Sequence, residues 1–164
     1  MKAWKDDLLI FVPYLVAFNL VIIQQINTQY QDVIISVRTE LDMSNFQLNI
    51  FWVLIGTVFA VVIYLVNYLI LTTGLSLVNL SGEVNQQVKY SLLLGDTLVS
   101  VATLFTQEYI DLSSELTIIL NSVLGLLFFA GLLYRREMSK KSFFTAVIIR
   151  GALYMVNSIW ALLK

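Results

Sequence analysis

The chain lacks the side chains on which most enzymes and metal sites depend. Its 164 residues include no cysteine and no histidine, which excludes disulfides, thiolate chemistry and the usual zinc, haem and iron–sulfur ligand sets. It also has no HExxH or GxSxG motif, no Walker-type glycine loop and no lysine inside an apolar run, so hydrolytic and phosphate-binding sites find no support. The composition predicts a protein that is not an enzyme and holds no metal ion or cofactor.

Charge is also scarce. Only 13% of the residues are charged, whereas soluble domains carry about 25%. The net charge is -1, and no run of Lys or Arg is longer than two residues, so neither nucleic acid nor an anionic lipid surface is an expected partner.

Apolar residues dominate instead. They make up 59% of the chain, and the mean hydropathy is +0.82. A soluble core cannot hide this much apolar surface, so the lipid bilayer must act as solvent for it. The sequence predicts an all-α polytopic transmembrane bundle that forms a single integral membrane domain over residues 1–164.

Five stretches satisfy the requirement for about 20 mainly apolar residues per span. The first is expected to be a retained anchor rather than a cleaved signal peptide. The polar connection Asn27–Gln47 is predicted to be a loop with a short interfacial helix, and Ser44 and Gln47 have the spacing of a capping box. A polar break is expected at Gly82–Gln87. The predicted spans are Leu8–Ile26, Asn45–Leu71, Val88–Thr106, Leu116–Tyr134 and Phe143–Leu163.

The distribution of Lys and Arg predicts the orientation. Positive charges concentrate in cytoplasmic connections. With five spans, seven such residues fall on the N-terminal side and two on the other. The N-terminus is therefore predicted to be cytoplasmic and the C-terminus outside, in the plasma membrane of a bacterial cell. The seven are Lys2, Lys5, Lys89, Arg135, Arg136, Lys140 and Lys141, and the two are Arg38 and Lys164.

Two apolar stretches contain a charge of opposite sign, Asp96 in the third span and Arg150 in the fifth. Charges in hydrocarbon are costly and usually face a partner, a cavity or a pathway. Each lies about eight residues past the cytoplasmic start of its span, or roughly 12 Å deep. The third and fifth spans are therefore expected to be neighbours, with Asp96 paired to Arg150. Polar stripes accompany both charges at helical spacing: Ser100, Thr103 and Gln107 follow Asp96, and Tyr154 and Asn157 follow Arg150.

Three interpretations of these charges remain open at this level. The first is a structural ion pair that fixes helix register, because removing one partner strands a charge in low dielectric. The second is an ion or proton pathway in which Asp96 titrates. The third is independent snorkelling of both side chains toward the headgroups.

Small and amide residues predict where helices approach closely. Gly56 and Ala60 form a small-xxx-small pair on the second span. Asn67 lies on the same face, and Asn121 and Gly125 lie four residues apart on the fourth span. These residues are interpreted as helix-packing positions, with an asparagine-lined substrate cavity as the alternative.

The layout resembles the Yip family of five-span membrane proteins. The local likeness is the stretch Gly82–Gly95, GEVNQQVKYSLLLG, which is similar to the Gly-rich segment that opens the family's third span. The chain departs from the family in having Asp96 after that glycine and no proline beyond Pro13. The resemblance implies a non-catalytic membrane scaffold, in bacteria sometimes accessory to an efflux transporter.

These observations support three functional hypotheses. The first is an accessory or scaffold subunit that binds another membrane protein, such as a transporter or secretion complex, or associates with itself. The second is a small transporter or channel component that uses the Asp96–Arg150 pair. The third is an immunity protein against a membrane-active peptide.

Overall fold

The computed structural model describes residues 3–77, 82–110, 113–136 and 138–163. Within these ranges the chain is all-helical, as the sequence predicts, with six helices and no strand. Five of the helices found there are long and apolar enough to cross a membrane, which is compatible with a multi-pass membrane protein. The helices are α1 (Ala3–Gln29), α2 (Gln31–Glu40), α3 (Asn45–Ser76), α4 (Gly82–Tyr109), α5 (Ser114–Tyr134) and α6 (Lys140–Leu162).

Serine residues cap three of the helices. The Ser44 side chain accepts a hydrogen bond from the backbone N–H of Gln47, and the Gln47 side chain accepts one from the backbone N–H of Ser44. This confirms the predicted capping box at the start of α3. Ser113 and Ser139 cap α5 and α6 in the same position. Each cap satisfies a backbone N–H that would otherwise have no partner in the first turn of the helix.

Two helices, α1 and α4, begin well before the apolar spans that the sequence predicts for them. The expected polar break at Gly82–Gln87 belongs to α4, which begins at Gly82. Hydropathy marks where a helix leaves the apolar layer, but the backbone continues its hydrogen bonding beyond that point. Pro13 is near the start of the apolar span Leu8–Thr28 but lies inside α1, which begins at Ala3. A proline there removes one helical hydrogen bond, and membrane helices tolerate such an interior proline.

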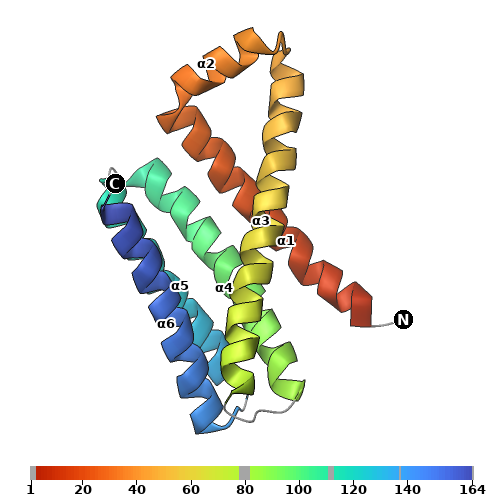
Figure 1. Ribbon diagram of the computed structural model, residues 1–164, viewed down its shortest axis with the longest axis vertical. Helices are drawn as coiled ribbons and strands as arrows, with labels where there is room; N and C mark the ends of the chain where they lie inside the picture. Colours follow the sequence, from red (N-terminus) through yellow and green to blue (C-terminus); the bar gives the residue numbers. More distant parts are fainter. Residues whose placement is uncertain (1–2, 78–81, 111–112, 137, 164) are drawn as a thin grey trace.

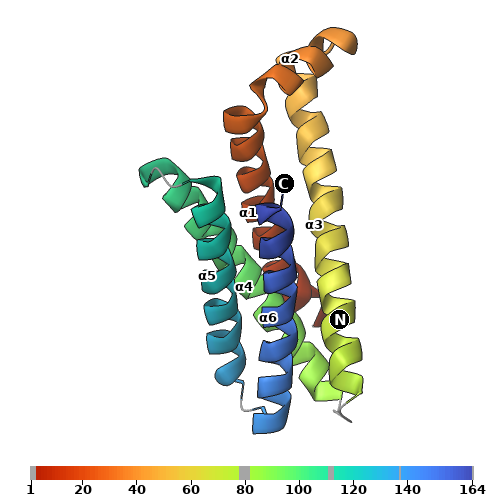
Figure 2. The ribbon, with the colours of Figure 1, turned by 60° about the vertical axis from the view of Figure 1, so that its left-hand side comes forward.

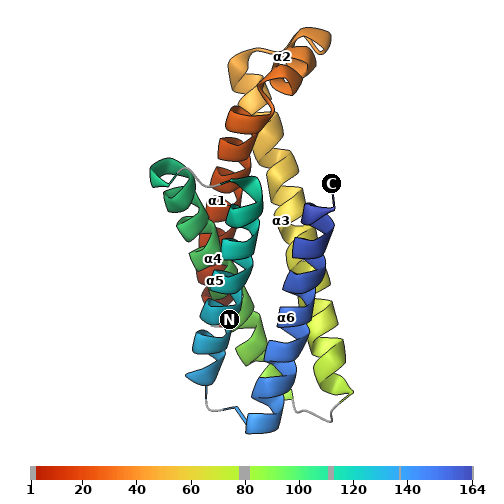
Figure 3. The ribbon, with the colours of Figure 1, turned by 90° about the vertical axis from the view of Figure 1, so that its left-hand side faces the viewer.

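The helices form a bundle from which one end projects (Figure 1). α4 packs against α5 and α1, α6 packs against α5 and α3, and α1 crosses α3. α4 and α6, which were expected to be direct neighbours, make more extensive contact with α5 than with each other. The C-terminus lies at the end of the bundle where α4 finishes, opposite the connections that follow α3 and α5 (Figures 1 and 3).

The closely packed core occupies the half of the bundle near those connections. Leu71 and Leu75 of α3 meet Val88 and Leu92 of α4 there, all essentially inaccessible. The outer faces carry large exposed apolar side chains, as lipid contact requires. Other core residues are Leu93, Phe129, Leu133 and Ala146, with Tyr14, Ala60 and Tyr64 extending the cluster to the crossing of α1 and α3.

The end of α1, all of α2 and the first part of α3 project from the bundle (Figure 1), and we refer to residues 20–54 as the arm. The 32 residues of α3 correspond to a length of about 48 Å, whereas the hydrocarbon layer is about 30 Å thick. In Figure 2, α2 and the start of α3 lie beyond the ends of α4 and α6. No residue of α2 is buried. The short helix expected between the first two spans is therefore present, and it packs little against the rest of the chain.

Candidate functional site

Asp96 of α4 and Arg150 of α6 form an ion pair inside the bundle. The Nη2 atom of Arg150 donates a hydrogen bond to Oδ1 of Asp96. The Arg150 side chain is 4% exposed and the Asp96 side chain 17%. The structure thus brings together the two side chains for which the sequence predicts a pair, and it turns the guanidinium toward the carboxylate rather than toward either end of the bundle.

Tyr154 of α6 completes the cluster as a third member. Its hydroxyl accepts a hydrogen bond from Arg150 Nη2 at 2.9 Å and donates one to Asp96 Oδ1 at 3.3 Å. The guanidinium carbon lies 4.4 Å from the centroid of the Tyr154 ring, within the range of a cation–π interaction. Arg150 Nε is buried without an acceptor among the described residues. The face of the Tyr154 ring therefore stabilises part of the guanidinium charge that no hydrogen bond satisfies.

Gly125 of α5 provides the space in which Tyr154 lies. A Cβ at this position would collide with the hydroxyl and Cζ of Tyr154. The sequence predicts Gly125 as a general packing residue. The structure gives it a specific neighbour, because any larger residue would displace the tyrosine that contacts both charges.

The two charges lie farther from the starts of their helices than from the starts of the predicted apolar spans. Arg150 is ten residues from the start of α6 at Lys140 and Asp96 fourteen from the start of α4 at Gly82, which correspond to about 15 Å and about 21 Å along the two helix axes. The difference arises because α4 begins before its apolar part. Arg150 is near the middle of α6, so the pair lies far from both ends of that helix.

The polar stripe of α4 does not act as one unit. Ser100 and Thr103 are buried, but their hydroxyls donate to the backbone oxygens of Asp96 and Val99 in the same helix, at 2.9 and 2.8 Å. Oε1 of Gln107 is buried without a hydrogen-bond partner in the described part of the chain. Of the predicted stripes, only Tyr154 and Asn157 border the ion pair or the space beside it.

Two polar side chains of α1, Tyr14 and Asn19, pack against the small residues Ala60 and Gly56 of α3. The sequence did not mark either of them as a packing residue. The Tyr14 hydroxyl donates to the backbone oxygen of Ala60 at 2.9 Å. Asn19 donates to the Thr57 hydroxyl at 3.1 Å and to its own helix at Leu15, and a Cβ at Gly56 would collide with its amide oxygen. In the sequence of α1, the only indication of this crossing of α1 and α3 is that Tyr14 and Asn19 are polar residues within an apolar run.

Two of the predicted helix-packing residues, Asn121 and Asn67, form no hydrogen bond to a neighbouring helix among the described residues. Oδ1 of Asn121 on α5 is buried without a partner among the residues described. Asn67 of α3 instead borders a cavity.

That cavity, of about 370 Å³, lies beside the ion pair between α1, α3, α4 and α6. Its wall combines the two charges and two amides with apolar side chains. The lining residues are Tyr14, Phe18, Ile63, Asn67, Asp96, Val99, Arg150, Leu153, Tyr154 and Asn157.

The described residues include no cluster of three acidic side chains suited to a metal ion. The chemistry that the site offers is charge pairing, hydrogen bonding and solvation of polar groups. No family model, curated protein or solved structure matches the chain.

Proposed function

We propose that this chain is a non-enzymatic multi-pass protein of the cell membrane that serves as an accessory or scaffold subunit, binding another membrane protein through its arm. The arm carries this proposal, because α2 has no buried residue and apolar residues of the adjoining α3, such as Phe46, Ile50 and Leu54, are exposed. The partner class is the membrane part of a transporter or secretion complex. The Yip-like layout of the sequence points to the same kind of role.

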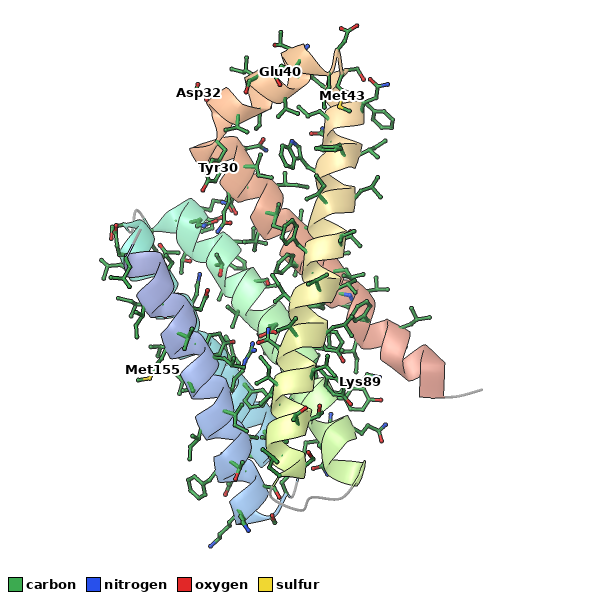
Figure 4. All side chains as sticks on the ribbon, in the orientation of Figure 1. Tyr30, Asp32, Glu40, Met43, Lys89 and Met155 are labelled. Carbon is green, nitrogen blue, oxygen red and sulfur yellow. The ribbon has the colours of Figure 1, made fainter. Side chains whose placement is uncertain are left out.

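The charges on the described residues support a cytoplasmic N-terminal side. Arg135, Arg136, Lys140 and Lys141 are exposed at the connection between α5 and α6. Acidic residues lie at the other end of the bundle, where Asp32 and Glu40 project from α2 (Figure 4). Because basic residues concentrate on the cytoplasmic side, the arm and the C-terminus would lie on the outer side of the membrane.

Site-specific photo-crosslinking tests the accessory function with a matched control. Leu54 in the arm and Leu127 on α5 are 62% and 61% exposed. A photoreactive amino acid at Leu54 should capture a membrane protein in cells, whereas the same group at Leu127 should capture only lipid. A native complex mass above that of the chain, after mild detergent extraction, should accompany the cross-link. Equal protein capture at both positions, or none at Leu54, would contradict the proposal.

A second candidate, a small transporter or channel component, rests on the cavity beside the ion pair. Intramembrane charges that border a cavity are a common feature of solute and ion routes. Flux through proteoliposomes should then fall on Asp96→Asn or Arg150→Gln while the protein remains folded. Unchanged flux in both variants would remove this candidate and leave the first unaffected.

A further inference from the structure

The cavity beside Asp96 contains polar groups that the protein itself does not satisfy. Both contacts of the Asp96 carboxylate are made by Oδ1, and Oδ2 has no partner among the described residues. The same holds for the side-chain amides of Asn67 and Asn157, which border the same space. Leaving such groups without hydrogen bonds in contact with lipid is costly, and a polar cavity of this size can hold several water molecules.

The cavity is closed toward the connections that follow α3 and α5. Between the ion pair and that end of the bundle lie four essentially inaccessible apolar residues, Leu71, Leu75, Val88 and Leu92. α3 and α6 also touch at this level, because a Cβ at Gly74 would meet the Ile149 side chain. The described core in this direction is apolar apart from the isolated buried hydroxyls of Ser91 and Ser142.

The opposite direction is open. The lining continues from Arg150 to Asn157 along α6, toward the end of the bundle where the C-terminus lies. Asn157 is exposed. α3 and α6 separate toward that end (Figure 1), and α1 and α4 contribute the remaining wall through Phe18 and Val99.

We propose that this space is a water-filled vestibule, which opens on the C-terminal side of the membrane, admits small hydrophilic solutes of either charge and ends blindly at Asp96 and Arg150. The lining holds one acid and one base, so its wall has no net charge and gives neither cations nor anions an advantage. This inference is independent of the accessory function, which rests on the arm.

The absence of cysteine from the chain makes single-cysteine accessibility a direct test. Asn157→Cys places a thiol on the vestibule wall. Val156→Cys is the matched control, because Val156 is adjacent, 67% exposed and outside the cavity lining. Ala146→Cys reports on the sealed core. Thr39→Cys and Lys141→Cys mark the two membrane faces, since these residues lie on α2 and at the start of α6.

The probes are cationic and anionic methanethiosulfonate reagents that do not cross membranes. Both should modify Asn157→Cys about ten-fold or more faster than Val156→Cys, because a thiol reacts as its thiolate and that form requires water. Modification should occur only from the face that exposes Thr39→Cys, and Asn67→Cys should follow more slowly. Ala146→Cys should not react.

Three results would overturn the proposal. Asn157→Cys could react no faster than Val156→Cys, or react only with a membrane-permeant apolar reagent, in which case lipid fills the space. It could also react from the Lys141→Cys face, in which case the cavity opens the other way. A preference of more than about ten-fold for one reagent charge at Asn157→Cys would contradict the neutral wall.

Discussion

Gly125 of α5 lies so close to the Tyr154 ring of α6 that no side chain larger than hydrogen fits between them. Tyr154 in turn contacts both Arg150 and Asp96. A glycine on one helix thereby sets the position of a polar cluster shared by two others. In a membrane, where close packing and hydrogen bonds largely replace the hydrophobic drive between helices, this contact links the packing of α5 to the stability of the ion pair.

Replacing Gly125 should therefore destabilise the fold. Gly125→Ala forces Tyr154 away from the two charges, and overpacking of this kind costs about 1–3 kcal/mol. Gly131→Ala is the control on the same helix, because nothing lies within 4 Å of a Cβ there and the helix propensity of alanine should stabilise it by about 0.5–1 kcal/mol. The free energy of unfolding in mixed detergent micelles measures both. Equal effects of the two substitutions would show that Tyr154 does not depend on Gly125.

The ion pair should respond in opposite ways to the reversal of one charge and to the exchange of both. Arg150→Asp or Asp96→Arg alone leaves two like charges together in the bundle, and loss of one partner of a buried pair costs about 3–5 kcal/mol. The double exchange restores opposite signs and should recover accumulation in the membrane. A double variant that accumulates less than either single variant would show that the two side chains do not stabilise each other.

An apolar pair separates stability from function at the same position. Replacing a buried ion pair by apolar residues of similar volume is often neutral or stabilising by about 1–4 kcal/mol. Asp96→Leu combined with Arg150→Met should therefore fold as well as the parent by the same unfolding measurement. If the pair serves only structure, photo-crosslinking at Leu54 should persist in this variant. If this double variant is as stable as the parent but loses flux in proteoliposomes, the result would instead favour the transporter or channel function.

The sequence predicted the pairing of Asp96 with Arg150 because these are the two charges deep in its apolar runs, and low dielectric leaves few other arrangements. It did not predict the separation of α3 from α6, on which the cavity depends, because the angle between helices follows from packing and not from periodicity. It also did not predict that α4 begins at Gly82, before its apolar part, because hydropathy locates the membrane boundary of a helix rather than its first residue. Tyr14 and Asn19 were missed because polar groups without charge stand out little in an apolar span.

The Tyr154 hydroxyl should matter more than an exposed tyrosine hydroxyl. Tyr154→Phe keeps the ring beside the guanidinium but removes a group that bonds to both charged side chains, and hydrogen bonds to charged groups contribute about 1.5–3 kcal/mol. Tyr109→Phe, at an exposed position at the end of α4, should have an effect close to zero. In the Gly125→Ala background, Tyr154→Phe should cost much less than in the parent, because the contacts are already lost.

The crossing of α1 and α3 should show a compensating pair of substitutions. Gly56→Ala places a methyl group where the Asn19 amide lies, so Asn19 must rotate and lose its hydrogen bond to Thr57. Membrane-buried hydrogen bonds of this kind contribute about 0.6 kcal/mol on average, and steric strain adds to that. In an Asn19→Ala background the methyl group meets the Ile22 side chain, at the ordinary contact distance of 3.4 Å, so Gly56→Ala should cost nothing further or should stabilise the helix. Thermal melting of the four proteins in detergent measures this coupling. Strictly additive effects would show that Asn19 does not occupy the space over Gly56, and the α1–α3 crossing would then require another contact to hold it.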